Sequence, residues 1–326
     1  MVITCIAILL IGLGLLFSPE QSYAFGPLSH VAIGLSVLDI IRAMSNSITD
    51  VIASNAWAYL YGCIGPDITF AKNLADFHNH CHNWSIGHRL LKLANTPKKK
   101  AFSLGYLSHL AQDTYAHNVF IPSKILRGKP HYISRHIMIE IFTDSYLKAF
   151  SKDVLNTLSE KNREKDLDFF LGQVVTPPLF SLKTNKFIFQ RMLFVQRLKN
   201  WGTIVEGLKR RHATFILMEE LQHVLKSSLA LTKSILLKPY ESECLKFDPT
   251  GLERLKLANY LKRQLKKSMP LTSRSFQEQL KREMLELFDK QSEPITRLVQ
   301  NALNEHDEGA KQPHQRPEWP LPLLSL

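Results

Sequence analysis

The stretch GYLSHLAQDTYAHNVF, residues 105–120, carries three potential metal ligands at intervals of four residues: His109, Asp113 and His117. On an α-helix, positions i, i+4 and i+8 lie along one stripe, so these three side chains project from the same side. The leucines of the stretch point elsewhere and can pack. A lone His–Asp pair at this spacing is usually a surface or capping interaction. The metal-binding interpretation therefore depends on further ligands elsewhere in the chain.

Further ligands are present in several segments. His136 and Glu140, in SRHIMIEIF, repeat the i, i+4 spacing on a strongly apolar predicted helix. Because buried carboxylates are almost never unpaired, two such helices can supply each other's partners through a metal. The segment DFHNHCHNW adds three histidines, and the residues before it add His30 and Asp67. Imidazole and carboxylate ligands without cysteine are typical of a catalytic rather than a structural zinc site.

The elements that must position these ligands are predicted to be helices. Strand signals are nearly absent, and apolar residues recur at intervals of three and four, which favours an all-α fold with short connections. Turn signals in CIGPD, NTPKKK, RGKP and TPP separate the helical segments. The expected helical segments are residues 33–44, 90–93, 101–111, 133–146, 187–201 and 213–238.

Residues 1–24 are predicted to be a secretory signal peptide. The apolar run ITCIAILLIGLGLLF has fifteen residues, fewer than the roughly 20 of a membrane-spanning helix. Ser22 and Ala24 suit a cleavage site that leaves Phe25 as the new amino terminus. The absence of Lys and Arg before this run leaves an uncleaved anchor as the alternative.

The mature chain is expected to have two parts, a helical body of residues 25–240 and an extension of residues 241–326. A leucine stripe between Leu252 and Leu265 lies beside lysines and arginines, and Ser275 with Glu278 predicts a capping box that opens a second helix. These basic amphipathic helices would either pack on the body with a solvated basic face or lie on a membrane surface. The Pro-rich end is expected to be extended.

The charge and the cysteines restrict the environment of the protein. The 41 Lys and Arg exceed the 29 Asp and Glu, which gives a net charge of +12. Among charged residues, cleavage after Ala24 would remove only Glu20. Such a charge favours anionic partners such as phospholipid headgroups, nucleic acid or the cell envelope, without choosing among them. In an oxidising compartment Cys63 and Cys81 have the opportunity to pair, leaving Cys244 free.

In chain order, these residues resemble the zinc-dependent phospholipase C family, whose superfamily includes the S1/P1-type nucleases. The family pattern runs from the mature amino terminus through a His, an Asp, a His and a His-x-x-x-Asp helix to another His and a His-x-x-x-Glu or Asp pair. The segments FGPLSHVAIG, GPD and LGYLSHLAQDTYAHN look most like the bacterial phospholipase C branch. The resemblance implies an all-helical bundle around a cluster of up to three zinc ions.

The resemblance also implies a ligand set. Among the clustered histidines, His82 is preferred to His78 because it follows Asp67 by fifteen residues and precedes Asn83-Trp84. The implied ligands are Phe25, His30, His82, His109, Asp113, His117, His136 and Glu140.

In this scheme, His82, His109 and Asp113 would hold one zinc ion. His117 with the pair at 136 and 140 would hold the second. The third would take His30, Asp113 as a bridge, and the free amine and carbonyl of Phe25, which exist only after cleavage. Asp67 would be catalytic, orienting or deprotonating the attacking water.

Two spacings depart from the family pattern. Only four residues separate Asp113 from His117, so His117 is expected on or just past the same helix, with its zinc displaced. The interval from His82 to His109 is also short, which predicts a trimmed loop over the site.

The expected function is zinc-dependent hydrolysis of a phosphodiester by an exported enzyme, with phospholipid as substrate. The alternatives are an S1/P1-type nuclease acting on single-stranded nucleic acid, and a non-catalytic zinc-binding protein that docks on a membrane or partner. A nuclease would need aromatic stacking platforms, for which Trp84, Tyr106, Tyr115 and Tyr132 are the candidates. No particular protein partner is indicated.

Overall fold

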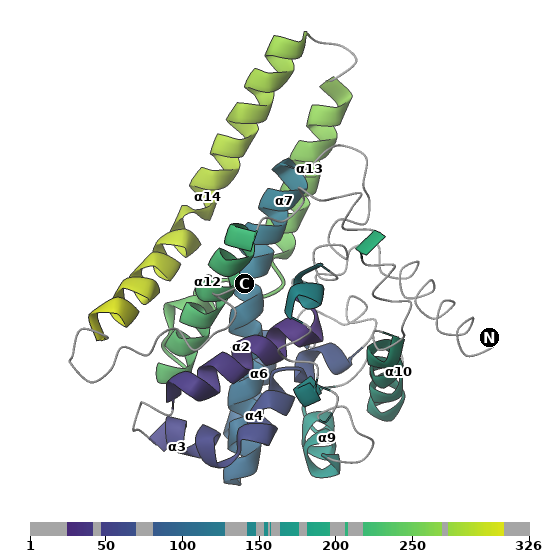
Figure 1. The fold of residues 1–326 in the computed structure, drawn as a ribbon, viewed down its shortest axis with the longest axis vertical. Helices are drawn as coiled ribbons and strands as arrows, with labels where there is room; N and C mark the ends of the chain where they lie inside the picture. The colour runs from purple at the N-terminus through teal and green to yellow at the C-terminus, as the bar shows by residue number, and fades with distance from the viewer. Residues whose placement is uncertain are drawn as a thin grey trace, which may run out of the picture.

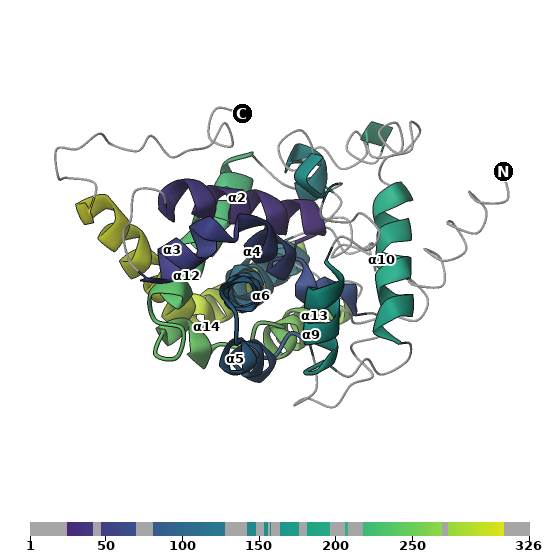
Figure 2. The ribbon, with the colours of Figure 1, turned by 90° about the horizontal axis from the view of Figure 1, so that it is seen from below.

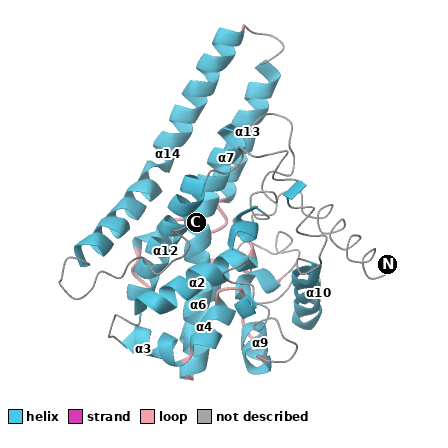
Figure 3. Cartoon of the chain, viewed as in Figure 1, coloured by secondary structure: helices cyan, strands magenta, loops and turns pink. Residues whose placement is uncertain are grey.

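The protein is all-α throughout the part that the structure, a computed structural model, describes, as the sequence predicts (Figures 1 and 3). The described residues are 25–41, 47–69, 81–127, 142–147, 153–155, 157, 164–175, 181–195, 206–207, 218–268 and 273–309. The helices before the middle of the chain are α2 (Pro27–Ile41), α3 (Ser47–Ser54), α4 (Ala56–Gly62), η1 (Gly65–Ile68), α5 (Trp84–Leu93), α6 (Pro97–Tyr115), η4 (Ala116–Phe120) and α7 (Ile121–Arg127). The later ones are α9 (Lys165–Gly172), α10 (Leu182–Val195), α12 (Met218–Leu237), η5 (Glu243–Lys246), α13 (Leu252–Ser268) and α14 (Arg274–Gly309).

Helix α6 is the centre of the body. Seen end-on in Figure 2, it is surrounded by α2, α4, α5 and α12, and every residue from Ala101 to Tyr115 is buried. The helix starts cleanly because the Thr96 side chain accepts a hydrogen bond from Lys99 N and Pro97 occupies the first turn. Hydroxyl groups in α6 remain satisfied inside the core by bonding to carbonyls one turn back, as Ser108 does to Leu104.

Glycines allow α4 and α6 to pack with their backbones nearly in contact. A Cβ atom on Gly105 would lie 2.0 Å from the Tyr59 carbonyl oxygen, and one on Gly62 would lie 2.1 Å from the Phe102 carbonyl oxygen. No side chain can be added at either position without moving a main chain. This close packing brings the end of α4, and Cys63 after it, against the face of α6 that carries His109.

The amino-terminal end of α2 is capped by a residue distant in sequence. The Asp144 carboxylate accepts hydrogen bonds from Leu28 N at 3.3 Å, Ser29 N at 3.0 Å and Ser29 Oγ at 2.7 Å. Backbone amides in the first turn of a helix lack internal partners, and a carboxylate there also complements the helix dipole. Asp144 thereby orients the helix that carries His30.

The last three long helices form a second layer. Helix α12 packs on α6, α13 packs on α7, and α14 packs on α12, so the carboxy-terminal part of the chain is joined to the body. Helices α13 and α14 run side by side and extend beyond the end of α7 (Figure 1). No helix in the described part of the chain is long and apolar enough to cross a membrane.

The predicted helical segments coincide with helices wherever the structure describes them, but most of 133–146 lies outside the described residues. Two kinds of difference remain. Helices α3, α4, α7 and α9 were missed, because they are only seven or eight residues long and show no extended periodicity. Helix α14 begins at Arg274 rather than at the predicted capping box, and the hydroxyl that accepts from Phe276 N is that of Ser273. The boundaries of the predicted parts at residues 24 and 240 stay predictions.

The three cysteines of the described chain are buried free thiols, so the Cys63–Cys81 pairing that the sequence allowed is not formed. Burial raises the pKa of the Cys63 and Cys244 thiols to about 12. These thiols are therefore apolar core groups at neutral pH, not ligands in the thiolate form.

The close packing of α4 on α6 predicts that adding one methyl group at Gly105 destabilises the protein. We expect Gly105→Ala to lower the free energy of unfolding by about 1–3 kcal/mol, because the new Cβ displaces the backbone of Tyr59. Thermal unfolding measures this loss. Gly172→Ala is the matched control, since its Cβ would meet only Leu182 Cδ2 at 3.5 Å. Equal unfolding temperatures for the two variants would contradict the packing described here.

Asp144 predicts a pH dependence of stability. Burial, opposed by hydrogen bonds from Ser29 and Leu28, raises the pKa of Asp144 from 3.8 to about 7. The folded state then binds the Asp144 proton more tightly than the unfolded state does. Protonation of Asp144 therefore stabilises the fold, and this contribution is fully present below pH 3.8 and is lost as the pH rises through 7.

We therefore expect Asp144→Asn, which resembles the protonated form, to match the parent near pH 4 and to exceed its stability near pH 7. Asp144→Ala should lose about 1 kcal/mol at both pH values, because the first amides of α2 lose their acceptor. Chemical denaturation across the pH range separates the variants. If the difference in free energy of unfolding between the parent and Asp144→Asn does not change with pH, the pKa of Asp144 is not raised.

Candidate metal centre

Six of the predicted site residues come together in one buried cluster. None exposes more than 6% of its surface, and they arrive from α2, η1, the turn before α5, α6 and η4. Residues separated by up to 87 positions thus share a site that no single element could build. The members are His30, Asp67, His82, His109, Asp113 and His117.

Asp113 is the centre of this cluster. Its Oδ2 atom lies 3.1 Å from His109 Nε2 and 3.4 Å from His82 Nε2, and its Oδ1 atom lies 3.5 Å from His30 Nε2. His117 Nε2 is 3.8 Å from Oδ2 on the following turn. A carboxylate with imidazoles around both oxygens has the geometry of a bridging ligand, as the resemblance implied for Asp113.

Asp67 lies on the other side of the same imidazoles. Its Oδ1 atom is 3.4 Å from His82 Nε2 and 3.9 Å from His109 Nε2, and Oδ2 is 3.9 Å from His30 Nε2. Two groups of three ligand atoms result, each spanning no more than 4.8 Å, His30–His109–Asp113 and Asp67–His82–His109. The geometry therefore gives Asp67 the position of a ligand in addition to the catalytic role inferred from the resemblance.

Outer hydrogen bonds fix how two of the histidines face the cluster. His109 Nδ1 donates to the Cys63 carbonyl oxygen at 2.8 Å, and His30 Nδ1 donates to Gln112 Oε1 at 2.6 Å. In a neutral imidazole the other nitrogen then carries the lone pair. Both Nε2 atoms therefore present lone pairs to the interior, the arrangement that outer partners commonly impose on metal-binding histidines.

The protonation states suit a cation. Burial, and next the electrostatic influence of neighbouring His109, lowers the pKa of His30 to about 4, so its imidazole is neutral at physiological pH. Burial alone would raise the pKa of Asp113, but His109, His30 and His117 outweigh it and hold the pKa well below 3.8. An ionised carboxylate and a neutral imidazole, as at Asp113 and His30, are the forms in which these groups bind a metal.

Several polar atoms of the cluster lack a satisfactory partner among the described residues. His30 Nε2 and Asp113 Oδ1 are buried and make no hydrogen bond with a described residue. The Nε2 atoms of His82 and His109 are only 3.0 Å apart. Buried polar atoms are normally satisfied, and two imidazole lone pairs at this distance repel unless a cation or proton lies between them. The donor set therefore fits zinc.

His117 is presented by an irregular turn. Helix α6 continues into the π-helix η4, where Ile121 N donates to the Ala116 carbonyl oxygen five residues back. Pro122 has no amide hydrogen to offer the Asn118 carbonyl oxygen, which accepts instead from Arg254 Nε at 3.2 Å. The close spacing of Asp113 and His117 is thus accommodated by widening the helix, a feature frequent at functional sites.

Residues of the carboxy-terminal part also enclose this turn. Gly251, at a φ of 54°, packs so closely that a Cβ atom would lie 2.4 Å from the His117 carbonyl oxygen. Asn118 Nδ2 donates to the Asp248 carbonyl oxygen at 2.8 Å. The loop before α13 thereby fixes the main chain on which His117 sits.

Of the remaining predicted ligands, only Phe25 lies within the described residues. Phe25 is buried, and its ring meets that of His30 edge-on at 5.8 Å between centroids. This brings the first residue of the expected mature chain beside the cluster. His136 and Glu140 lie outside the described residues, as does His78, so the second zinc set stays a prediction.

Sequence reasoning missed the supporting residues. Gln112, Arg254 and Asp144 each hold a site element, and the Cys63 carbonyl orients His109. Gln112 had a local signal, since it is a polar residue beside Asp113 on a helix that is otherwise buried. Arg254 and Asp144 had none, because their contacts span more than a hundred residues.

Comparison with known proteins agrees with this site. Residues 29–185 match the family model described as zinc dependent phospholipase C. No significant match was found among curated proteins or among solved structures. The matched segment includes all six clustered residues, in the order that the family pattern requires. The resemblance to the zinc-dependent phospholipase C family is therefore confirmed over residues 29–185.

Proposed function

We propose that the protein is an exported zinc-dependent phosphodiester hydrolase that cleaves phospholipids between the glycerol and the phosphate. The observation that carries the proposal is the buried cluster, in which His30 and His109 turn lone pairs toward Asp113 with their outer nitrogens already bonded. A histidine of an ordinary core has no reason to be paired with three others around one carboxylate.

The residues that would hold the metal follow from the two groups of ligand atoms. His30, His109 and Asp113 form one group, and Asp67 and His82 join His109 in the other. Zinc in such a site lowers the pKa of water toward neutrality and neutralises negative charge on phosphoryl oxygens. Up to three ions are proposed, with Phe25, His117, His136 and Glu140 completing the set.

The chain's own residues contribute binding, orientation and proton transfer. The Asp67 carboxylate is 5% exposed at the cluster, and we assign it the role of orienting the attacking water and accepting its proton. Gln112 and the Cys63 carbonyl keep the imidazoles from rotating. Exclusion of bulk water strengthens each of these charge interactions.

Phospholipid is favoured over single-stranded nucleic acid by the state of the aromatic residues near the cluster. Tyr106 is fully buried and donates to the Cys81 carbonyl oxygen, Tyr115 is 5% exposed, and Trp84 Nε1 donates to the Phe247 carbonyl oxygen. A described platform for stacking bases is therefore lacking. The nuclease and the non-catalytic zinc protein remain the alternatives that the next experiment separates.

The first test measures zinc and turnover together. We expect the exported chain to begin at Phe25, to contain two to three zinc ions, and to hydrolyse a chromogenic phosphocholine diester and phospholipid in preference to single-stranded DNA. His109→Ala should lower metal affinity by more than the roughly 10–100-fold typical of an outer partner, because it removes a ligand shared by both groups.

His88→Ala is the matched control, since His88 lies outside the cluster and contacts Pro239 and Tyr240. It should keep its zinc and its activity. Zinc binding without turnover on any phosphodiester would favour the non-catalytic alternative, and preferential cleavage of DNA would favour the nuclease. A chain that retains Met1 would refute export with cleavage after Ala24.

The outer partner of His30 gives a second prediction. Gln112→Met removes the acceptor of the 2.6 Å hydrogen bond while keeping the volume, so the imidazole loses its fixed orientation. We expect zinc affinity to fall roughly 10–100-fold, with little change in the folded structure. Competition with a zinc-binding dye measures the affinity, and circular dichroism checks the fold. Unchanged affinity would mean that Gln112 does not orient His30 for a metal.

A further inference from the structure

The outer end of the α13–α14 pair carries most of its positive charge. We define the hairpin tip as residues 260–268 of α13 and 274–283 of α14, which lie beyond the family-matched segment and project past the end of α7 (Figure 1). The hairpin tip contains seven Lys and Arg but two Glu. In contrast, residues 284–309 of α14 contain six Asp and Glu but two Lys and Arg. The pair is therefore electrically polarised along its length.

Most of the cations at the hairpin tip are not neutralised by neighbours. Arg274 pairs with Glu278, and Lys262 donates to the Leu126 carbonyl oxygen. Five others are exposed and make no ion pair with a described residue. These are Arg263, Lys266, Lys267, Lys281 and Arg282.

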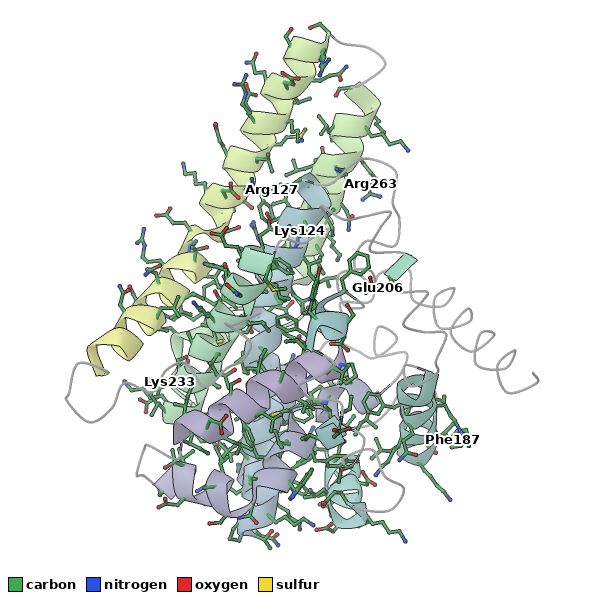
Figure 4. The ribbon with its side chains drawn as sticks, viewed as in Figure 1. Lys124, Arg127, Phe187, Glu206, Lys233 and Arg263 are labelled. Carbon is green, nitrogen blue, oxygen red and sulfur yellow. The ribbon has the colours of Figure 1, made fainter. Side chains whose placement is uncertain are left out.

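The neighbouring basic residues of α7 differ in this respect. Lys124 and Arg127 are labelled in Figure 4. Lys124 pairs with Glu220 and Arg127 pairs with Asp289, so both charges are already balanced. The hairpin tip thus holds five exposed cations without a described ion pair, whereas these two cations of α7 are paired; Arg263 of the tip is labelled in the same figure.

Apolar surface accompanies this charge. Phe276, in the first turn of α14, is 48% exposed, and Tyr260 on α13 is 53% exposed. Aromatic side chains beside lysines and arginines are the composition of surfaces that insert shallowly into a lipid headgroup layer.

Ordinary helix electrostatics accounts for only part of the pattern. Lys266 and Lys267 are in the last turn of α13, where cations complement the helix dipole. Arg263 lies one turn earlier, and Lys281 and Arg282 lie in the second and third turns of α14, outside the range of that effect.

We propose that the hairpin tip docks on the surface of an anionic phospholipid bilayer, holding the catalytic body next to lipid substrate. This inference deepens the proposed function, on which its lipid substrate rests, but the docking itself uses residues outside the zinc site. The cations would bind acidic headgroups, and Phe276 would enter the interface, while the acidic end of α14 would face away from the membrane.

The test compares variants of the chain that begins at Phe25 by sedimentation with lipid vesicles, measured before appreciable hydrolysis. The parent should bind vesicles containing phosphatidylglycerol far better than pure phosphatidylcholine, and about 0.5 M salt should release it. The triple variant Arg263→Gln, Lys266→Gln, Lys267→Gln should bind on the order of 100-fold more weakly, because each cation near an anionic surface contributes several-fold. Phe276→Ser should weaken the binding that persists at high salt.

The matched control is Arg89→Gln, Lys92→Gln, Lys290→Gln, which removes the same side-chain types and the same charge from exposed positions away from the hairpin tip. It should bind like the parent. Equal weakening in both triple variants would reduce the effect to net charge and overturn the proposal. So would undiminished vesicle binding in the hairpin-tip variant, or a loss confined to binding of a single-stranded oligonucleotide.

Hydrolysis of a soluble phosphocholine diester separates this proposal from the proposed function. The hairpin-tip variant should keep the parent's rate on that substrate and lose rate only on vesicles. If vesicle binding is unaffected while soluble turnover persists, the docking surface is wrong and the enzyme assignment stands. If the soluble diester is not hydrolysed while vesicle binding behaves as expected, the proposed hydrolase function is wrong and the docking surface stands.

Discussion

A carboxylate buried in a helical core, that of Asp113, is the constraint on which the rest of the site depends. Its charge cannot remain inside the body without compensation, since desolvation of an isolated ion is prohibitive. Three imidazoles supply it from α2, the turn before α5 and α6 itself. Helix α6 must therefore be enclosed by other elements while leaving room for these rings, and the glycine contacts with α4 meet that need by bringing two backbones together.

The support of the cluster extends beyond the segment that defines the family. Pro122 leaves the Asn118 carbonyl without its helical partner, and Arg254 supplies the hydrogen bond from α13. Gly251 packs on the His117 backbone, and the Arg254 guanidinium also lies 3.9 Å from the centre of the Phe288 ring of α14. Residues after 240 are consequently part of the framework of the site.

The net charge of +12 is unevenly distributed, and the distribution carries more information than the total. In the body, ion pairs such as Lys186 with Asp168 balance cations locally. At the outer end of the α13–α14 pair, five neighbouring cations are exposed without a described ion pair. Long-range attraction to an anionic surface acts on the whole molecule, but the region that makes contact is decided by where unpaired charges and apolar side chains coincide.

The sequence by itself determined the helical class, the resemblance to the family over residues 29–185, and the placing of His109 and Asp113 on one helix face. These follow from chain order and from the i, i+4 spacing on a periodic helix, which is a local property. Only the tertiary structure decided the distances among elements. It brought Asp67 within 3.4 Å of His82, made the Asp144 cap of α2, and left Cys63 and Cys81 unpaired. These contacts join residues that no local periodicity relates, since they arise from how whole helices pack around α6.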